Sequence, residues 1–155
     1  MAELQVGDKA PDFSLPANGD QTISLKDHKG KKVVLYFYPK DDTPGCTKEA
    51  VGFSEHLGDF EAAGAVVLGM SKDPVKKHDK FVAKHELGVS LLSDENDAVT
   101  EAYGAWVEKS MYGKKYMGIE RSTFLIGEDG KLLQIWRKVK VPGHVEAVLE
   151  AVKAA

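Results

Sequence analysis

Two short runs of the sequence are apolar at almost every position, and they restrict the fold more than any other feature. Residues 32–38 read KVVLYFY and residues 65–71 read AVVLGMS. A strand with one solvent-exposed face alternates apolar and polar side chains, whereas a strand covered on both faces does not. Both runs therefore predict central strands of a sheet that is covered on its two faces.

Helical and extended patterns alternate around these two strands. Apolar residues recur at intervals of three and four over residues 44–63, which predicts a helix. Pro74 suits the first turn of another helix, expected over Val75–His85. The other predicted elements are strands over residues 21–25, 91–92, 121–126 and 131–138, the last two as a hairpin, and helices ending near Ala102 and spanning residues 144–153. This order predicts an α/β fold with helices on both faces of a layered sheet.

Length and composition indicate one soluble domain. The chain has 155 residues, of which 43% are hydrophobic and 29% charged, values typical of globular proteins. Because there is no repeat, low-complexity tract or Ser/Gly-rich linker, we expect a single domain over residues 1–155.

Charge and hydropathy argue against several classes of partner. A formal net charge of -3 gives no electrostatic reason to expect nucleic acid or an anionic membrane. The longest apolar run, VVLYFY, is too short to span a bilayer, and no secretory leader is visible at the start. A single cysteine cannot form an internal disulfide, which fits a reducing compartment, so we expect a cytoplasmic protein.

That cysteine, Cys46, lies where a helix is predicted to begin. Thr43 is a good N-cap and Pro44 suits the first helical position, so Cys46 falls in the first turn. Unpaired N–H groups and the positive end of the helix dipole favour an ionised sulfur there. Gly45 has no side chain, so a small substrate or another thiol could approach closely.

The alternative is that Cys46 is an inert, buried hydrophobe. It begins a stripe that faces the sheet and continues through Ala50, Phe53, Leu57, Phe60 and Ala63. Free cysteines are often buried in this way. A thiolate at the floor of a shallow pocket would account for both observations.

The residues around Cys46 resemble a known active site. The stretch YFYPKDDTPGCTKE (residues 36–49) is similar to that of peroxiredoxins of the Q type, also called bacterioferritin comigratory proteins. Their pattern of Pro, three residues, Thr, two residues, Cys is met by Pro39, Thr43 and Cys46. The likeness continues through GDKAPDFSLP, VVLGMSKD, LLSDE and WVEKSMYGKKYMGIERSTFLI, and so covers nearly the whole chain.

The resemblance implies a thioredoxin-like fold, with a central mixed β-sheet flanked by helices on both faces, and thiol-dependent reduction of hydrogen peroxide and organic hydroperoxides. It implies that Cys46 is the peroxidatic cysteine, that the Thr43 hydroxyl binds peroxide and thiolate, and that Pro39 shields the pocket from water. It also implies that Arg121 keeps the sulfur ionised and polarises the peroxide. No cofactor is implied.

Two charged residues near this motif have an ordinary alternative. Judged by itself, Arg121 would be a solvated or salt-bridged strand residue. Glu49, one helical turn after Cys46, could orient Arg121 or simply face solvent. The sequence leaves both questions open.

The chain departs from the family pattern at the resolving cysteine. The two positions where Q-type members carry that cysteine are Val51 and Val82 here. The chain is therefore a one-cysteine member or a variant whose resolving cysteine was replaced. Either way, a sulfenic acid at Cys46 must condense with an external thiol, such as thioredoxin or glutathione with glutaredoxin. We expect a monomer or a weak homodimer.

The remaining polar motifs indicate no further site. The five histidines, His28, His56, His78, His85 and His144, have no metal-ligand spacing, so we expect solvated surface residues and no metal. Residues 94–98 (DENDA) lack the glycine of a calcium loop and read as helix-capping residues. Residues 108–118 combine basic and aromatic side chains, and a loop near the active site is favoured there over a nucleic-acid surface.

Two other functions compete with the peroxidase. In a redox sensor or thiol-binding module, Cys46 would be oxidised slowly and would signal to a partner. In an inert interaction domain of thioredoxin-like fold, it would not react at all.

Overall fold

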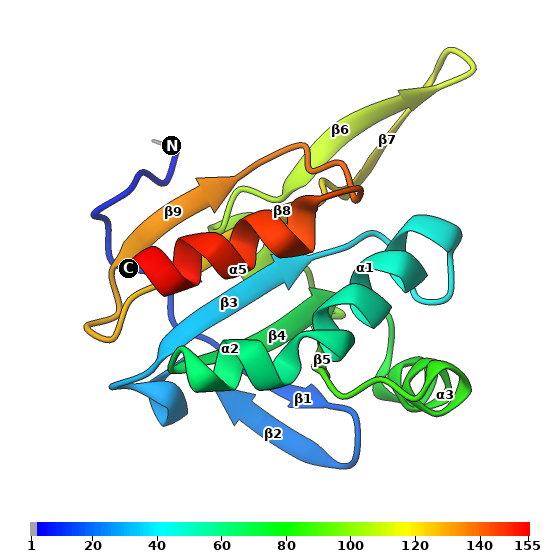
Figure 1. The fold of residues 1–155 in the computed structure, drawn as a ribbon. Helices are drawn as coiled ribbons and strands as arrows, with labels where there is room; N and C mark the ends of the chain where they lie inside the picture. The colour runs from blue at the N-terminus through cyan, green and yellow to red at the C-terminus, as the bar shows by residue number, and fades with distance from the viewer. Residues whose placement is uncertain (1–2) are drawn as a thin grey trace.

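The computed structural model describes residues 3–155, which form a seven-stranded mixed sheet and a separate two-stranded hairpin (Figure 1). The strand order in the sheet is β2-β1-β5-β4-β3-β8-β9. Its strands are β1 (Ser14–Ala17), β2 (Gln21–Ser24), β3 (Lys32–Phe37), β4 (Ala65–Ser71), β5 (Ser90–Ser93), β8 (Ser122–Ile126) and β9 (Leu132–Trp136), and the hairpin consists of β6 (Trp106–Met111) and β7 (Lys114–Ile119). The helices are α1 (Pro44–Glu55), α2 (Leu57–Ala62), α3 (Val75–His85), α4 (Ala98–Ala102), α5 (His144–Ala154) and the 3-10 helix η1 (Leu25–His28).

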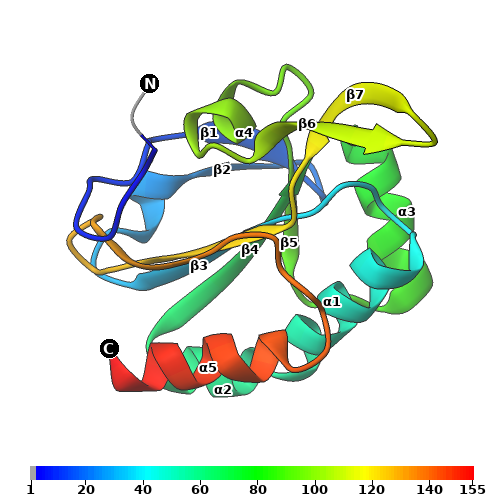
Figure 2. The ribbon, with the colours of Figure 1, turned by 90° about the horizontal axis from the view of Figure 1, so that it is seen from above.

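Strand β3 lies in the middle of the sheet, parallel to β4 and antiparallel to β8. Its side chains alternate between two hydrophobic clusters, as predicted from its apolar sequence. Val34 and Tyr36, together with Tyr38 directly after the strand, join the cluster formed with α1, α2, α3 and α5. Val33, Leu35 and Phe37 join the cluster on the opposite face, beneath the N-terminal segment and the chain around α4. Figure 2 shows these two layers on either side of the sheet, which confirms the predicted α/β class.

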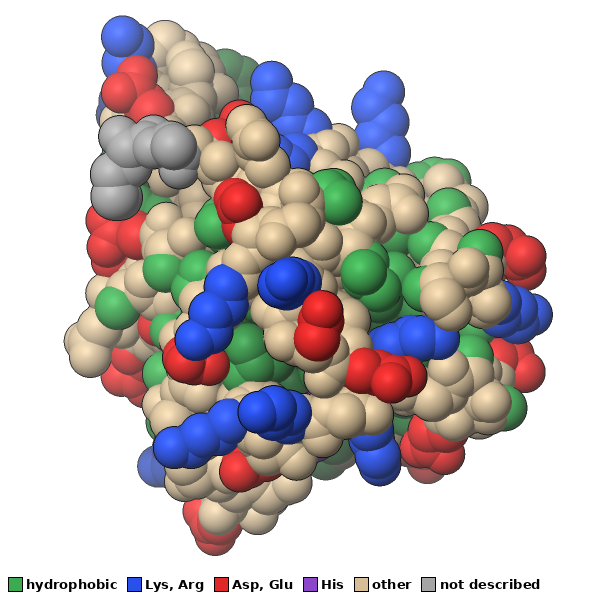
Figure 3. Space-filling model, turned by 90° about the vertical axis from the view of Figure 1, so that its left-hand side faces the viewer, with side chains coloured by type: hydrophobic (Ala, Val, Ile, Leu, Met, Phe, Trp, Pro, Cys, Tyr) green, Lys and Arg blue, Asp and Glu red, His purple; other side chains and the backbone are tan. Residues whose placement is uncertain are grey.

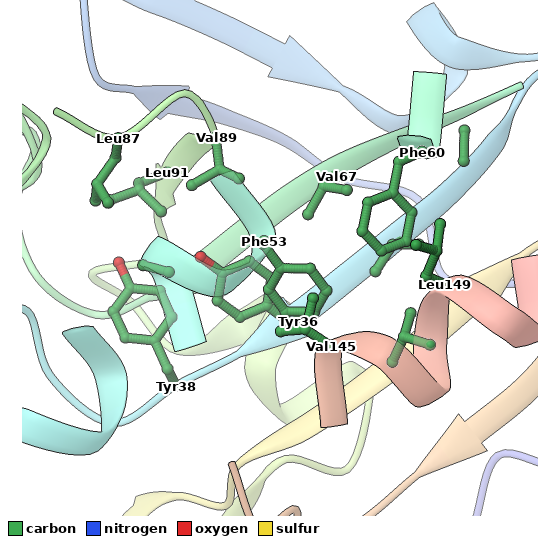
Figure 4. Packing of buried hydrophobic residues seen from close by; sticks show 14 of the residues in the cluster. Tyr36, Tyr38, Phe53, Phe60, Val67, Leu87, Val89, Leu91, Val145 and Leu149 are labelled. Atoms are coloured by element: carbon green, nitrogen blue, oxygen red, sulfur yellow. The ribbon is translucent and has the colours of Figure 1, made fainter. Parts of the chain in front are cut away.

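The first cluster is built around aromatic rings. Tyr36 of β3 stacks on Phe53 of α1 with ring centroids 4.6 Å apart, and Phe53 in turn packs against Phe60 of α2 (Figure 4). Val145 and Leu149 of α5 belong to the same cluster and lie on the same face of the sheet as these rings. Helix α1 is thereby packed against the centre of the sheet.

The helix predicted over residues 44–63 is two helices. Helix α1 ends at Glu55 and α2 begins at Leu57, with His56 between them at φ -99° and ψ 8°. Gly52 and Gly58 lie on either side of this break, and glycine is a weak helix former. The apolar stripe nevertheless holds, because Cys46, Ala50, Phe53 and Phe60 are buried, with Leu57 and Ala63 packed partly buried beside them.

Residues 108–118, predicted as a loop, form most of the β6–β7 hairpin. Trp106 lies opposite Ile119 and Met111 opposite Lys114, and both turn residues, Tyr112 and Gly113, have positive φ angles. This backbone suits a two-residue hairpin turn. The hairpin projects from the body of the molecule (Figure 1). Its exposed large apolar side chains are Met111, Tyr112, Tyr116 and Met117.

The predicted surface position of the histidines was wrong for two of the five. His78 of α3 and His144 at the start of α5 are buried, with 0% and 6% exposure. Each has polar partners that offset the cost of its burial. Nε2 of His144 lies 2.8 Å from the Thr123 hydroxyl, and His78 belongs to a larger cluster of buried polar groups.

The surface is charged and mixed. On the face shown in Figure 3, lysine and arginine side chains are interspersed with aspartate and glutamate. Over residues 3–155, no helix is both long enough and apolar enough to cross a membrane. In the same part of the chain, no three side chains of the metal-binding types are grouped as ligands.

Candidate active site

Helix α1 begins directly after the loop that follows β3, and its start is built as the sequence predicts. Thr43 has extended backbone angles and Pro44 is the first helical residue. The side chain of Thr43 makes no capping hydrogen bond to the helix, and its hydroxyl donates to the Lys40 carbonyl oxygen at 3.0 Å. The first N–H groups of any α-helix lack an intrahelical acceptor, and those of Gly45 and Cys46 belong to this set.

Cys46 lies in the first turn of α1 and is 2% exposed. Its sulfur accepts a hydrogen bond from Nη2 of Arg121 at 3.3 Å. Arg121 precedes β8, 75 positions along the chain from Cys46. The antiparallel pairing of β8 with β3 brings this segment back to the start of α1. The sulfur is thus buried in the core cluster yet in contact with a cation.

Glu49 is fully buried, so it does not face solvent. Of the two predicted alternatives, orientation of Arg121 is the one that fits this burial. Oε1 of Glu49 accepts a hydrogen bond from Nη1 of Arg121 at 2.7 Å, so one guanidinium holds both Glu49 and Cys46. Burial raises the pKa of Glu49 to about 7, against the opposing effect of Arg121. Burial alone would lower the pKa of Arg121, but Glu49 and Cys46 together raise it above its ordinary value.

Gly45 has a more specific role than predicted. A Cβ atom at this position would lie 3.1 Å from Nη2 of Arg121, the nitrogen that contacts the sulfur. That separation is tighter than an ordinary van der Waals contact. The absence of a side chain at Gly45 therefore gives the guanidinium the room to reach Cys46.

Gly45→Ala is expected to slow the reaction of Cys46 with peroxide severalfold, because the new methyl group displaces Nη2 from the sulfur. The measurement is the second-order rate of Cys46 oxidation. Gly58→Ala is the matched control, since a Cβ there meets nothing within 4 Å. This control should keep the parent rate and raise the free energy of unfolding by about 0.5–1 kcal/mol. Equal rates for Gly45→Ala and the parent would contradict the assigned role of Gly45.

The other predicted site residues lie on the approach to α1 or within the core. Pro39 is exposed and Thr43 half-buried, both in the loop between β3 and α1. Val51 and Val82, the expected positions of a resolving cysteine, are partly buried and pack against the cluster that contains Cys46. They fill space there as ordinary hydrophobic residues.

Two residues that were not predicted also belong to the surroundings of the site. Burial lowers the pKa of Lys109 in β6, and the nearby Arg121 lowers it further, while Glu120 and Cys46 oppose this. Burial lowers the pKa of His144 to about 4, again with a contribution from Arg121. Lys109 was missed because its segment was predicted to be a loop, and nothing local in the sequence signals the burial of His144.

Comparison with known proteins gives consistent matches over most of the chain. The model of the AhpC/TSA family matches residues 6–135. A putative peroxiredoxin bcp of Coxiella burnetii is 56% identical over 146 residues, covering 94% of this chain and 97% of the relative. Peroxiredoxin Bcp of Bacillus subtilis is 49% identical over 150 residues, covering 97% and 96%.

Solved structures agree with the fold. Peroxiredoxin Q of Xanthomonas campestris superposes with a TM-score of 0.88 at 49% identity, covering 92% of this chain and 90% of that one. A structure described for the alkyl peroxide reduction activity of the Xanthomonas campestris bacterioferritin comigratory protein has the same TM-score and coverage at 48% identity. These similarities confirm the thioredoxin-like fold and the resemblance found in the sequence. The chain therefore belongs to the AhpC/TSA family, as a Q-type peroxiredoxin with a single cysteine, and is a thiol-dependent peroxidase.

Proposed function

We propose that the chain reduces hydrogen peroxide and organic hydroperoxides through a sulfenic acid at Cys46, which an external thiol then resolves. The observation that carries this proposal is the contact between Arg121 and the Cys46 sulfur, with Glu49 anchoring the guanidinium from a fully buried position. A cation held in this way is preorganised for the charges of the reaction.

In the first step, the Cys46 thiolate attacks one oxygen of the hydroperoxide and the O–O bond breaks. The sulfur is oxidised to a sulfenic acid, and the other oxygen leaves with the bonding electrons and takes up a proton to give an alcohol or water. Nη2 of Arg121 carries two protons, so it can donate to the sulfur and to a peroxide oxygen. Donation to the peroxide stabilises the negative charge that develops on the leaving oxygen.

The surroundings of the sulfur supply further donors. The N–H groups of Gly45 and Cys46 at the start of α1 are preorganised for a negative charge. The Thr43 hydroxyl, bonded to Lys40 in this structure, can rotate toward a bound peroxide. Pro39 would limit the entry of water from the loop side.

In the second step, an external thiol attacks the sulfenic sulfur, which forms a mixed disulfide and releases water. A second thiol then reduces this disulfide and frees Cys46. The support is that Cys46 is the only cysteine and that Val51 and Val82 occupy the positions of a resolving cysteine. Thioredoxin and glutathione with glutaredoxin are the proposed reductants, in a cytoplasmic setting and with the enzyme as a monomer or weak homodimer.

The experiment that tests this scheme separates its two steps. One equivalent of peroxide is added to the reduced protein, and the sulfenic acid is trapped with dimedone and located by peptide mass spectrometry. The trapped group should be on Cys46. Turnover is then measured separately with glutathione–glutaredoxin and with thioredoxin as the reductant. A protein that consumes peroxide without a trappable Cys46 sulfenic acid would overturn the proposal.

Excess peroxide is expected to convert Cys46 to the sulfinic acid, because no internal thiol competes for the sulfenic acid. Intact-mass spectra across graded peroxide concentrations should show the second oxygen added soon after the first. As the control, the same series with reduced glutathione present should show the mixed disulfide in its place. A sulfenic acid that persists at high excess of peroxide would contradict this expectation.

A further inference from the structure

A cluster of buried and partly buried polar residues lies beside the proposed site, and the mechanism above does not use it. It gathers where β3, β4 and β5 end, against the first half of α3. Its members are Tyr38, Asp41, Ser71, Asp73 and His78. Asp41 is in the loop between β3 and α1, which also carries Pro39 and Thr43.

His78 is the centre of this cluster and is completely buried. Its Nδ1 lies 2.7 Å from Oδ2 of Asp41, and its Nε2 lies 2.9 Å from the carbonyl oxygen of Leu92. The other carboxylate oxygen of Asp41 accepts a hydrogen bond from the Tyr38 hydroxyl at 2.6 Å. Every polar atom of the His78 and Asp41 side chains thus has a partner.

These contacts fix how many protons the pair holds. A carbonyl oxygen only accepts, so Nε2 of His78 must carry a proton and donate it to Leu92. A second proton must lie between Nδ1 and Oδ2 of Asp41, because two lone pairs 2.7 Å apart would repel. Removing one partner of such a buried pair is strongly destabilising, because the other group is left buried without its partner. The pair is therefore a strong attachment between α3 and the loop.

The backbone of the loop is attached at the same place. The N–H group of Asp41 donates to Oδ2 of Asp73 at 2.8 Å, and the Ser71 hydroxyl donates to the same oxygen. The next residue, Asp42, has a positive φ of 60° that non-glycine residues rarely adopt. Its carboxylate is held by two further residues of α3, Lys84 at 2.7 Å and His85 at 2.8 Å.

We propose that His78 is a positioning residue for the peroxidase reaction. Through Asp41 it fixes the loop of residues 39–43, and with it the Pro39 ring and the Thr43 hydroxyl in front of the first turn of α1. This role rests on the proposed function, because it assumes that peroxide reacts at Cys46 between the loop and Arg121. Helix α3 is then the support of the peroxide-binding loop.

The test compares two reactions of the same sulfur. Peroxide needs the groups of the loop, whereas a simple alkylating agent such as iodoacetamide needs only an accessible thiolate. In His78→Ala the rate of oxidation of Cys46 by peroxide is expected to fall on the order of 10²-fold, as misplacement of an active-site group by about 1 Å does. The rate of alkylation should stay near that of the parent. A folded His78→Ala protein with the parent peroxide rate, or with both rates reduced equally, overturns the proposal.

Two substitutions of Asp41 test the same attachment without changing His78. One keeps the hydrogen bonds of the pair and the other removes them, so the test does not depend on whether His78→Ala folds. In Asp41→Asn the amide can donate to Nδ1 of a neutral His78 and accept from Tyr38, so the peroxide rate should be largely retained. In Asp41→Ala both contacts are lost and the rate should fall as in His78→Ala. Equal losses in the Asn and Ala variants would contradict the role of this pair, even if His78→Ala cannot be purified.

The matched control is His28→Ala, which changes a partly exposed histidine of η1, an element that precedes the start of β3, whereas the loop follows the end of β3. It should change neither rate. Amide hydrogen exchange of residues 40–43, measured in the parent and in His78→Ala, tests the attachment without any peroxide. Unchanged exchange of residues 40–43 in His78→Ala would contradict the proposed role of His78. Failure of the parent to react at Cys46 would contradict only the proposed function.

Discussion

Cys46→Ser is expected to abolish peroxide consumption while leaving the fold intact. A serine hydroxyl is nearly the size of the thiol, but it does not ionise and cannot form a sulfenic acid. The hydroxyl can still accept the hydrogen bond from Arg121, so the free energy of unfolding should change by no more than about 1 kcal/mol. The measurement is peroxide consumption with an added thiol, beside a denaturant titration of both proteins.

The parent protein in the same assay distinguishes the peroxidase from the two alternatives that the sequence alone left open. Fast turnover that depends on Cys46 is the result expected of a peroxidase. Stoichiometric oxidation without turnover would instead identify a redox sensor, and no reaction at all would identify an inert domain. Consumption of peroxide by Cys46→Ser at the parent rate would contradict the site itself.

Arg121→Met is expected to lower the rate of Cys46 oxidation by about 10²–10³-fold, because the donor to the sulfur and to the leaving oxygen is lost. It should also destabilise the protein by about 3–5 kcal/mol, since Glu49 then stays buried without its cation. Part of this loss is relieved if Glu49 takes up a proton, because its pKa of about 7 rises further once Arg121 no longer lowers it. Stopped-flow oxidation and denaturant unfolding measure the two effects.

A double variant distinguishes catalysis from stability. In Arg121→Met/Glu49→Leu the buried ion pair is replaced by an apolar pair, which is often neutral or stabilising. Its free energy of unfolding should return close to that of the parent, while the oxidation rate stays low. If the rate recovered together with the stability, Arg121 would be a structural residue and not a part of the reaction.

The central part of the fold could be predicted because its sequence is nearly unambiguous. The runs that became β3 and β4 are apolar on both faces, and α3 was predicted over its observed residues. The hairpin was missed because its turn is Tyr112-Gly113 and not the usual Asn-Gly or Asp-Gly. Strand β1 was missed because it is only four residues long and contains Pro16, which is uncommon inside strands.

The sequence names the residues of the candidate site but does not predict how they are arranged. The position of Cys46 in a first helical turn follows from Thr43 and Pro44, whereas the role of Arg121 came only from the family resemblance. No local pattern links residues so far apart in the chain, because β8 returns to β3 only in the folded sheet. The burial of Glu49 and His78 could not be predicted either, because the charged partners that stabilise it lie on other segments of the chain.

The break at His56 has a consequence for how a bulky protein thiol could reach a sulfur that is almost fully enclosed. Because α1 and α2 do not share one continuous ladder of backbone hydrogen bonds, fraying that starts at Pro44 can stop before it reaches α2. Opening of α1 alone would expose Cys46 at a lower cost than global unfolding, because local units open more readily than the whole domain. Under the proposed mechanism, a large external thiol would then reach the oxidised sulfur while α2 and the rest of the tertiary structure stay folded.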